Sequence, residues 1–280
     1  MTQPVFADVD TGVDDALAVI YLLASDDADL VGIGATAGNT DVDQVCRNTL
    51  GLLRLCGATG IPVSRGAAAP LDAPLRTAED LHGPTGLGYA VPPPPQRSPV
   101  GYDTAAAWVR AARAHPAALV GVSCAPLTNL ALALRLEPGL PGLLRRLVVV
   151  SARNTDIDPR AAEEVFAAWG RRPGLVVCDR DLTGRAVIDP AVMCRLTEQT
   201  GWRTPLIEFI DDAVRFRFEV NLERGIGYRA HLADPLAAAV ALDPALGTRP
   251  EAFAERFVAR VGALARRLAR ASDDQARVRS

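Results

Sequence analysis

The sequence predicts an α/β protein built on one mostly parallel sheet with helices on both faces. Short apolar runs bounded by glycine or acidic residues alternate along the chain with longer segments of helical pattern. This alternation is typical of parallel sheets, because each crossover helix packs on one face of the sheet. With 280 residues, of which 49% are hydrophobic, the chain is long enough to bury a large core.

Six short apolar runs are predicted as buried strands. In chain order they are PVFADV (4–9), DLVGIGATAG (29–38), IPVSRG (61–66), AALVGVSCA (117–125), RLVVVS (146–151) and PGLVVCD (173–179). Helices are expected between them at 14–24, 41–56, 104–114, 159–169 and 190–200. The last third is expected to be mainly helical, with helices at 207–223, after Asp234 and at 251–271.

The proline-rich stretch VPPPPQRSP, residues 91–99, is predicted as a surface loop. Proline-rich segments also serve as extended linkers between domains. Only about ninety residues precede this one, however, and their strands alone would leave one face of a sheet uncovered. A single domain covering residues 1–280 is therefore expected.

The charge pattern favours neither nucleic acid nor membrane as a partner. The net charge is −3 at pH 7, the chain has no lysine, and its arginines are scattered among acids. The N-terminus lacks a signal-like pattern, and no apolar run approaches the roughly twenty residues of a membrane span. Five cysteines without a C-x-x-C pair indicate reduced, buried thiols. A cytoplasmic protein is expected.

The first turn, FADVDTGVDDALA, places the carboxylates of Asp8, Asp10, Asp14 and Asp15 between a predicted strand and a predicted helix. Ligands of open parallel sheets bind at the carboxyl ends of strands. Two carboxylates about 4 Å apart repel by roughly 4 kcal/mol at an effective dielectric of about 20, whereas a helix N-terminus stabilises one nearby carboxylate by at most about 1 kcal/mol. Helix capping explains a single aspartate better than such a cluster. The turn therefore predicts a hard cation, calcium or magnesium.

Other motif families fit the chain less well. An EF-hand loop fails because Gly12 stands at its third ligand position and Val19 where its bidentate glutamate belongs. A phosphatase of the D-x-D type, with Asp8 as nucleophile and Asp10 as acid/base, lacks a lysine for the phosphate and stays an open alternative. The stretch GVSCA, residues 121–125, is a near miss for a nucleophile elbow, with alanine in its last position.

The stretch DVDTGVDDALA resembles the D-x-D-x-G-x-D-D-A-x-A signature of the inosine-uridine preferring nucleoside hydrolases. Four further segments follow in the order of that family: AGN (37–39), HGPTGLG (82–88), PLTNLA (126–131) and ADP (233–235). The resemblance extends from residue 6 to about residue 246. It implies a single Rossmann-like α/β domain, a calcium ion, hydrolysis of N-ribosidic bonds, and a homodimer or homotetramer.

The resemblance also implies a set of site residues. Calcium would be bound by Asp10, Asp15, Asp234 and the main-chain carbonyl of Cys124. Asp10 would take the proton from a calcium-bound water that attacks the anomeric carbon, because calcium alone is too weak an acid to ionise water at neutral pH. The ribose hydroxyls would be held by Asp14 and Asn39, and His82 lies in a glycine-rich loop that could close over the substrate. Asp234-Pro235 is expected as a helix N-cap followed by proline.

Two departures from the family pattern affect the substrate side. Ala233 stands where a histidine commonly helps to protonate the leaving base, and His231 lies two residues upstream as a candidate substitute. The family's long loop before the aspartate-proline pair is shortened, so that Ala152 and Arg153 replace a glutamate and a phenylalanine while Asn154 is retained. Losing a general acid typically costs about 10²- to 10⁴-fold in rate.

These departures predict an atypical substrate. One hypothesis is a calcium-dependent N-glycosidase acting on a riboside whose base needs no protonation, such as cationic nicotinamide riboside. Arg153 would suit an anionic riboside, carrying a phosphate or a carboxylate. The alternative is a non-catalytic calcium- and sugar-binding relative, or a different reaction on the same metal site. The sequence does not determine the base or the oligomeric state.

Overall fold

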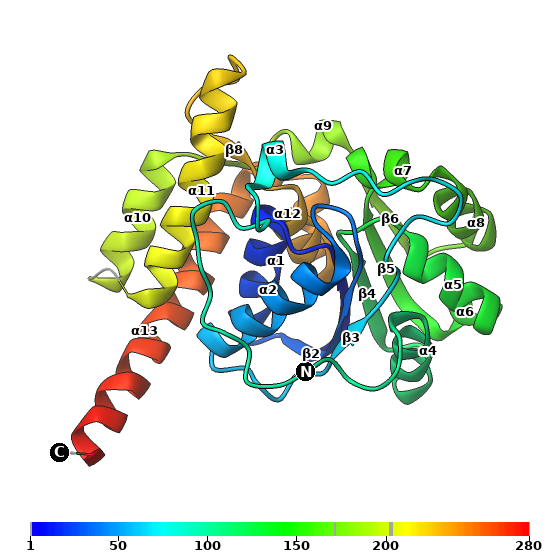
Figure 1. The fold of residues 1–280 in the computed structure, drawn as a ribbon, viewed down its shortest axis with the longest axis horizontal. Coiled ribbons are helices and arrows are strands. Elements are labelled where there is room, and N and C mark those ends of the chain that lie inside the picture. The colour runs from blue at the N-terminus through cyan, green and yellow to red at the C-terminus, as the bar shows by residue number, and fades with distance from the viewer. Residues whose placement is uncertain (1, 171, 202–203, 280) are drawn as a thin grey trace.

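The computed structural model describes residues 2–170, 172–201 and 204–279. Its centre is a six-stranded sheet in the order β3-β2-β1-β4-β5-β6, in which every neighbouring pair is parallel (Figure 1). The strands are β1 (Gln3–Val9), β2 (Ala28–Ala35), β3 (Val63–Arg65), β4 (Leu119–Ser123), β5 (Leu144–Val150) and β6 (Leu175–Cys178). Each coincides with one of the six apolar runs, so the predicted parallel sheet is confirmed.

Helices cover both faces of this sheet, as predicted. They are α1 (Val13–Leu23), α2 (Val42–Leu55), α3 (Glu79–His82), α4 (Thr104–Ala114), α5 (Thr128–Leu136), α6 (Leu140–Leu143), α7 (Ala152–Ile157), α8 (Pro159–Trp169), α9 (Arg180–Thr183), α10 (Pro190–Thr200), α11 (Pro205–Glu223), α12 (Ala233–Leu242) and α13 (Phe253–Arg279). One core lies between the sheet and the group of α1, α2 and α10–α13, and a second core lies under α4, α5 and α8.

Helix starts follow side-chain caps that are visible in the sequence. The side chains of Asp103, Asp158 and Asp189 each accept a backbone N–H in the first turn of α4, α8 and α10, and proline follows the latter two caps directly. Thr204 caps α11 in the same way before Pro205. Because the caps are local, the predicted bounds of α4, α8 and α10 match the structure residue for residue.

Several local expectations were wrong. Helix α12 begins two residues earlier than expected, at Ala233 with Leu232 as its N-cap, so Asp234 lies inside the first turn and does not cap it. The shortened loop after β5 forms the short helix α7, and an antiparallel pair, β7 (Val187–Ile188) and β8 (Ala230–His231), was not foreseen. Cys194 is exposed, unlike the other four thiols.

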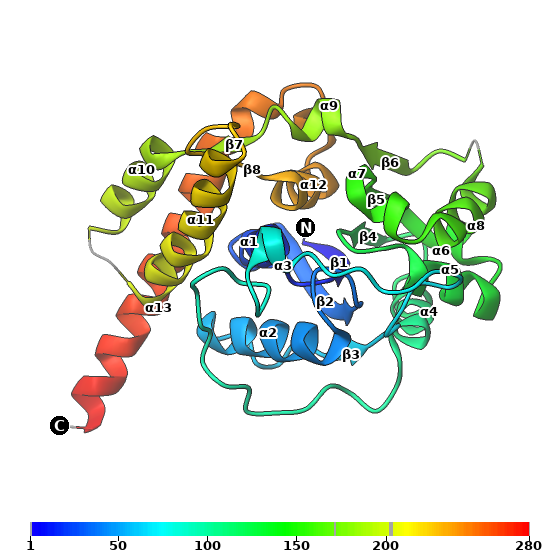
Figure 2. The same cartoon turned by 45° about the horizontal axis from the view of Figure 1, so that its top comes forward.

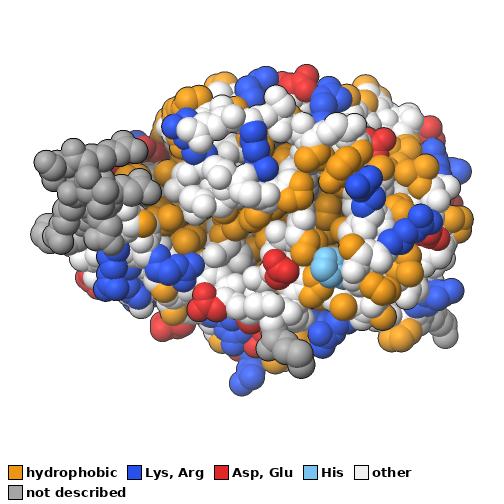
Figure 3. Space-filling model, turned by 90° about the horizontal axis from the view of Figure 1, so that it is seen from below, with side chains coloured by type: hydrophobic (Ala, Val, Ile, Leu, Met, Phe, Trp, Pro, Cys, Tyr) orange, Lys and Arg blue, Asp and Glu red, His pale blue; other side chains and the backbone are white. Residues whose placement is uncertain are grey.

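The long connection between α3 and α4 runs outside α2 as coil, including residues 91–99 (Figure 2). Arg54 of α2 donates a hydrogen bond to the carbonyl of Pro94 in this segment. Figure 3 views the molecule from below; on this face hydrophobic side chains form a band across the middle, and basic and acidic side chains are interspersed around it. No helix within the described ranges is long and apolar enough to cross a membrane.

Candidate functional site

Within the acidic turn, Asp8 is hydrogen-bonded to side chains of the protein core. Its Oδ1 accepts hydrogen bonds from Thr36 Oγ1 (2.6 Å) and Asn129 Nδ2 (3.0 Å), and its Oδ2 accepts one from Trp108 Nε1 (2.9 Å). The residue is 1% exposed, and burial raises the pKa of its carboxyl despite these donors. Both oxygens are engaged at the end of β1, so the structure does not support Asp8 as the nucleophile of a phosphatase.

Asp10 and Asp15 meet each other under Asn39. The Asn39 side-chain amide donates to Asp10 Oδ1 and to Asp15 Oδ2, both at 3.0 Å, and its backbone N–H donates to Asp10 Oδ2 at 2.8 Å. Asp15 also accepts the backbone N–H groups of Asp10 and Gly12, which fixes its carboxylate over the start of α1. A neutral amide thus separates the two carboxylates but does not neutralise them.

Asp234 completes the cluster from the opposite side of the site. Its carboxylate and those of Asp14 and Asp15 offer oxygens that all lie within 4.8 Å of one another. Asp234 enters from the first turn of α12, and helix α12 packs directly against α1. Of these residues Asp14 is the most accessible, since its side chain is 23% exposed whereas Asp15 and Asp234 are buried.

Burial and mutual repulsion raise the pKa of the inner carboxyls. Burial, followed by the charge of Asp15, raises the pKa of Asp10 well above its ordinary value. Burial, followed by the charge of Asp14, raises the pKa of Asp15 to about 7 and also lifts that of Asp234 well above normal. Ionisation of these carboxyls is therefore unfavourable in the protein on its own.

This donor set fits a divalent cation. Among the described residues no arginine forms an ion pair with Asp10, Asp15 or Asp234, and the only basic group within 4.0 Å of Asp14 is His82. Buried charges without a partner are costly, whereas carboxylate oxygens are the preferred ligands of calcium and magnesium. A cation would remove the repulsion that raises these pKa values.

The carbonyl of Cys124 lies at the same edge of the sheet, directly after β4. It accepts a hydrogen bond from Asn154 Nδ2 at 2.6 Å, and the Cys124 thiol lies 4.0 Å from the carbonyl of Asp234. Asn154 belongs to α7, the short helix that replaces the expected loop, and it is 9% exposed. The structure thus brings Asn154 and Cys124 next to each other, with Asn154 covering the carbonyl that was predicted as a metal ligand.

His82 lies on a segment that crosses the acidic turn. This segment, residues 76–82, ends in α3 and is named the strap below; in Figure 2 α3 lies in front of α1. His82 Nδ1 accepts the backbone N–H of Val13 at 3.0 Å, and a Cβ on Gly12 would collide with it. His82 is 5% exposed, and burial lowers its pKa to about 4, so the imidazole is neutral at pH 7. In the glycine-rich loop that begins at His82, this first residue is buried and hydrogen-bonded, and closure of the loop over a substrate stays a prediction.

Three arginines fasten the strap. Arg153 donates to the carbonyls of Arg76 and Thr77, Arg217 of α11 donates to the carbonyl of Leu81, and Arg224 pairs with Asp80 at 2.7 Å. The Arg153 guanidinium is thus engaged with backbone carbonyls. Arg217 was missed by the sequence analysis, because it lies in a helix rich in charged residues where nothing local distinguishes it.

His231 lies on β8, outside the cluster. Its Nδ1 is buried and, among the described residues, has no hydrogen-bond partner. Burial lowers its pKa, and the charges of Arg229 and Arg217 lower it further. Within the described residues, the structure shows no contact between His231 and the inner carboxylates. It therefore does not support His231 as a substitute for the histidine that Ala233 replaces.

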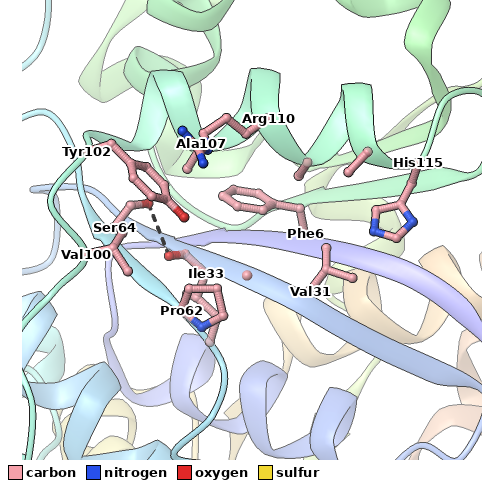
Figure 4. A pocket seen from close by; sticks show the side chains of 13 residues that line it. Phe6, Val31, Ile33, Pro62, Ser64, Val100, Tyr102, Ala107, Arg110 and His115 are labelled. Atoms are coloured by element: carbon pink, nitrogen blue, oxygen red, sulfur yellow. Dashed lines mark hydrogen bonds between the residues drawn. The ribbon is translucent and has the colours of Figure 1, made fainter.

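Two other features are separate from this cluster. Ser123 of the GVSCA stretch is fully buried and donates to the carbonyl of Ala125, which leaves no exposed nucleophile. A cavity of about 280 Å³ lies between β2, β3 and α4, with Phe6 at its centre and Tyr102 and His115 at its ends (Figure 4). The described residues that line it include no acid, so it offers no site for a cation.

Comparison with known proteins decides the family. A profile described as inosine-uridine preferring nucleoside hydrolase matches residues 5–271. The chain belongs to this family. As a nucleoside hydrolase it is an N-glycosidase, an enzyme that cleaves N-glycosidic bonds by hydrolysis. The carboxylate cluster at the carboxyl end of β1 is where such an enzyme can bind its metal.

Known relatives resemble this nucleoside hydrolase over most of its length. It is 30% identical over 266 residues to the pyrimidine-specific ribonucleoside hydrolase RihA of Shewanella woodyi, and 32% identical over 264 residues to RihA of Citrobacter koseri. Both matches cover 90% of this chain and 83% of the relative. The purine-preferring ribonucleoside hydrolase from Gardnerella vaginalis has the same fold, with a TM-score of 0.86 at 23% identity, covering 94% of this chain and 99% of that one.

Proposed function

We propose that this nucleoside hydrolase cleaves the N-glycosidic bond of ribonucleosides in a calcium-dependent reaction with Asp10 as the base. The observation that carries the proposal is the buried carboxylate cluster, in which Asp10 touches Asp15 and, within the part of the chain that the structure describes, no arginine ion pair compensates the charge. Clustered carboxylates at the carboxyl end of a parallel sheet can bind a cation, and one of them can accept a proton from water.

Calcium would be held by Asp15 and Asp234, with Asp10, Asp14 and the Cys124 carbonyl beside them. When bound, the cation supplies Lewis acidity and orients oxygen ligands. Asp10 accepts the proton of the attacking water, because its carboxylate is turned into the site and held there by Asn39. Calcium is preferred over zinc because the donors are all oxygens.

The ribose is assigned to the accessible side of the cluster. Asp14 has the only partly exposed carboxylate of the group and therefore suits a sugar hydroxyl. Asn39 and Asn154 present amides within the same site, although both already hydrogen-bond protein groups. His82 is neutral and accepts the Val13 N–H through Nδ1, so it offers Nε2–H as a donor.

A pyrimidine ribonucleoside is the first substrate to test. The support is the 30–32% identity to relatives named pyrimidine-specific ribonucleoside hydrolases. Purine nucleosides are expected to be poorer, because Ala233 removes the acid that would protonate the leaving base.

We further infer a homodimer or homotetramer in the cytoplasm. The support for assembly is a group of exposed apolar side chains, Leu222, Ile226 and Tyr228, at the end of α11 and after it. The support for a reducing compartment is that all five cysteines are free. Light scattering of the purified protein, compared with a Leu222→Ser, Ile226→Ser variant, tests the assembly.

The decisive experiment is release of ribose from a nucleoside panel with calcium and after chelation. Calcium-dependent release that disappears in Asp10→Ala supports the proposal. Release that persists unchanged after complete chelation, or in Asp10→Ala, contradicts it. Calcium binding with no release from any nucleoside would favour the second candidate, a non-catalytic calcium- and sugar-binding relative. Ala233 and the shortened loop before Asn154 are the observations that favour this candidate.

A further inference from the structure

Arg217 extends from α11 toward the substrate side of the site. Helix α11 packs against both α1 and α3. The Arg217 Nη1 donates to the carbonyl of Leu81 at 3.0 Å, and the next residue, His82, has its Nδ1 3.8 Å from Asp14 Oδ1. One hydrogen bond therefore places this guanidinium at the rim of the acidic turn.

The guanidinium carries a charge that the protein does not pair. Among the described residues no carboxylate lies within 4.0 Å of Arg217, and the Leu81 carbonyl takes one of five N–H donors. The side chain is half-buried, so part of its hydration is lost. Burial lowers its pKa, while the negative charges of Asp14 and Asp234 act in the opposite direction. A half-buried cation with free donors is suited to an anionic partner.

Arg217 interacts electrostatically with residues on either side of Ala233, the position that the family resemblance connects with the leaving base. Its charge acts on Asp234 and on His231, the residues that flank the acid-free position Ala233. It also acts on His82, above Asp14, where the ribose is assigned. The hydrogen bond to Leu81 holds Arg217 beside His82 and Asp14, and we therefore assign the guanidinium to the region beyond the sugar.

We propose that Arg217 receives the leaving base as an anion, and that the substrates are ribonucleosides whose base carries an oxo group next to the glycosidic nitrogen. This inference rests on the proposed function and names its substrate class. The planar guanidinium matches the N–C=O edge of such a base, uracil being the simplest case, with two parallel donors. Stabilisation of a developing anion takes the place of protonation by the missing acid.

The bond changes balance without another reactant. The bond between the anomeric carbon and the base nitrogen breaks, and its electron pair stays on the base, where the charge spreads onto the oxo group facing Arg217. Water adds its oxygen to the anomeric carbon and gives one proton to Asp10. The base anion takes up a proton after it leaves the site, which restores neutrality.

The same charge disfavours a cationic base. Nicotinamide riboside, a substrate that the sequence alone suggested, brings its positive ring toward the Arg217 guanidinium. Two unit charges about 4 Å apart repel by roughly 4 kcal/mol at an effective dielectric of about 20. Loss of the arginine charge should therefore affect the two classes of base in opposite directions.

The test compares three substrates in four proteins. The substrates are uridine, nicotinamide riboside and 4-nitrophenyl riboside, whose nitrophenolate leaves without help. The proteins are the wild type, Arg217→Met, Arg217→Lys and the control Arg224→Met, which removes another fastening of the strap on the same helix without reaching the site. The readout is kcat/KM for ribose release in calcium, with calcium affinity and thermal melting as checks on folding.

The expected result is a change in substrate ratio. In Arg217→Met, kcat/KM for uridine should fall by about 10²-fold or more, that for 4-nitrophenyl riboside much less, and that for nicotinamide riboside should stay or rise. Arg217→Lys should recover part of the uridine activity, and Arg224→Met should leave the ratios unchanged. Equal losses on all three substrates would show that Arg217 only supports the strap and would overturn the inference. No release by the wild type from any substrate would overturn the proposed function itself.

Discussion

Asp8 and Asp10 lie two residues apart at the carboxyl end of β1, and both are 1% exposed. The groups that surround the two carboxylates differ, however. Asp8 accepts hydrogen bonds from three neutral donors. Asp10 shares Asn39 with a second carboxylate and touches Asp15. Burial alone therefore does not mark a functional carboxylate. A buried carboxylate whose neighbours are other carboxylates needs a partner from outside the chain.

The sharpest way to break this comparison is the isosteric substitution Asp10→Asn. It removes the proton acceptor but keeps the shape, so ribose release should fall by about 10²- to 10⁴-fold. The melting temperature in chelator should fall less than in Asp8→Asn, because the loss of a repelling charge offsets the loss of one Asn39 hydrogen bond. Ribose release at the wild-type rate would remove Asp10 from the role of base.

The second prediction concerns the cation. Asp234→Ala deletes one carboxylate of the group that lies within 4.8 Å, so calcium affinity should fall by more than the roughly 10- to 100-fold that loss of an outer partner costs. Isothermal titration with calcium measures this change. Asp212→Ala, on the exposed side of α11, is the matched control and should titrate like the wild type. An unchanged calcium affinity in Asp234→Ala would reject the assigned ligand set.

The third prediction applies to the other member of the comparison. Asp8→Asn replaces an acceptor by an amide that points N–H groups at the donors of Thr36, Asn129 or Trp108. The free energy of unfolding should drop by about 1–3 kcal/mol, since buried donors lose their acceptor. Urea unfolding at pH 7 measures it, and calcium binding to the folded fraction should persist. A destabilisation no larger than that of Asp10→Asn would remove the distinction between the two residues.

The last prediction concerns the wild type rather than a variant, and it is a pH dependence of stability. The pKa of Asp15 is about 7 in the folded protein and about 3.9 when unfolded. Between these values the folded state binds more protons, so stability in chelator should fall as pH rises from about 4 to about 7 and beyond, because the pKa values of Asp10 and Asp234 are raised as well. Saturating calcium should abolish this slope, because the bound ion keeps the carboxylates ionised. Melting curves at pH 5 and pH 8 with and without calcium test it, and identical slopes in both series would contradict it.

Much of the fold could be predicted because its signals are local. The six strands are short apolar runs, and α4, α8 and α10 begin at an aspartate cap that the sequence displays. The acidic turn was equally visible, since its four aspartates are close neighbours in the chain. Asp234 does lie beside Asp14 and Asp15, but its expected helix position was wrong, because proline at the third helical residue gives the same local pattern as proline at the first.

The rest depends on contacts that no short window contains. Arg217 differs from Arg215, the other arginine of α11, because its side of the helix packs beside α3, more than a hundred residues earlier in the chain. The engagement of Arg153 with carbonyls of the strap, and of Asn154 with the Cys124 carbonyl, likewise follows from how the shortened loop folds into α7. Helix α7 itself replaces a loop, and its fold could not be read from a missing segment.

The strap also has a consequence for the rate of turnover. Because His82 is buried over Gly12, we expect that the strap must lift before a ribose can reach Asp10 and Asp15. Gly83, next to His82, has a φ of 78° that only glycine adopts easily. The exposed pair of Arg224 and Asp80 is weakened by salt, whereas the hydrogen bonds of Arg153 and Arg217 to carbonyls respond less. We expect the strap to act as a gate whose opening frequency, rather than bond cleavage, limits turnover on good substrates, and to open faster as ionic strength rises.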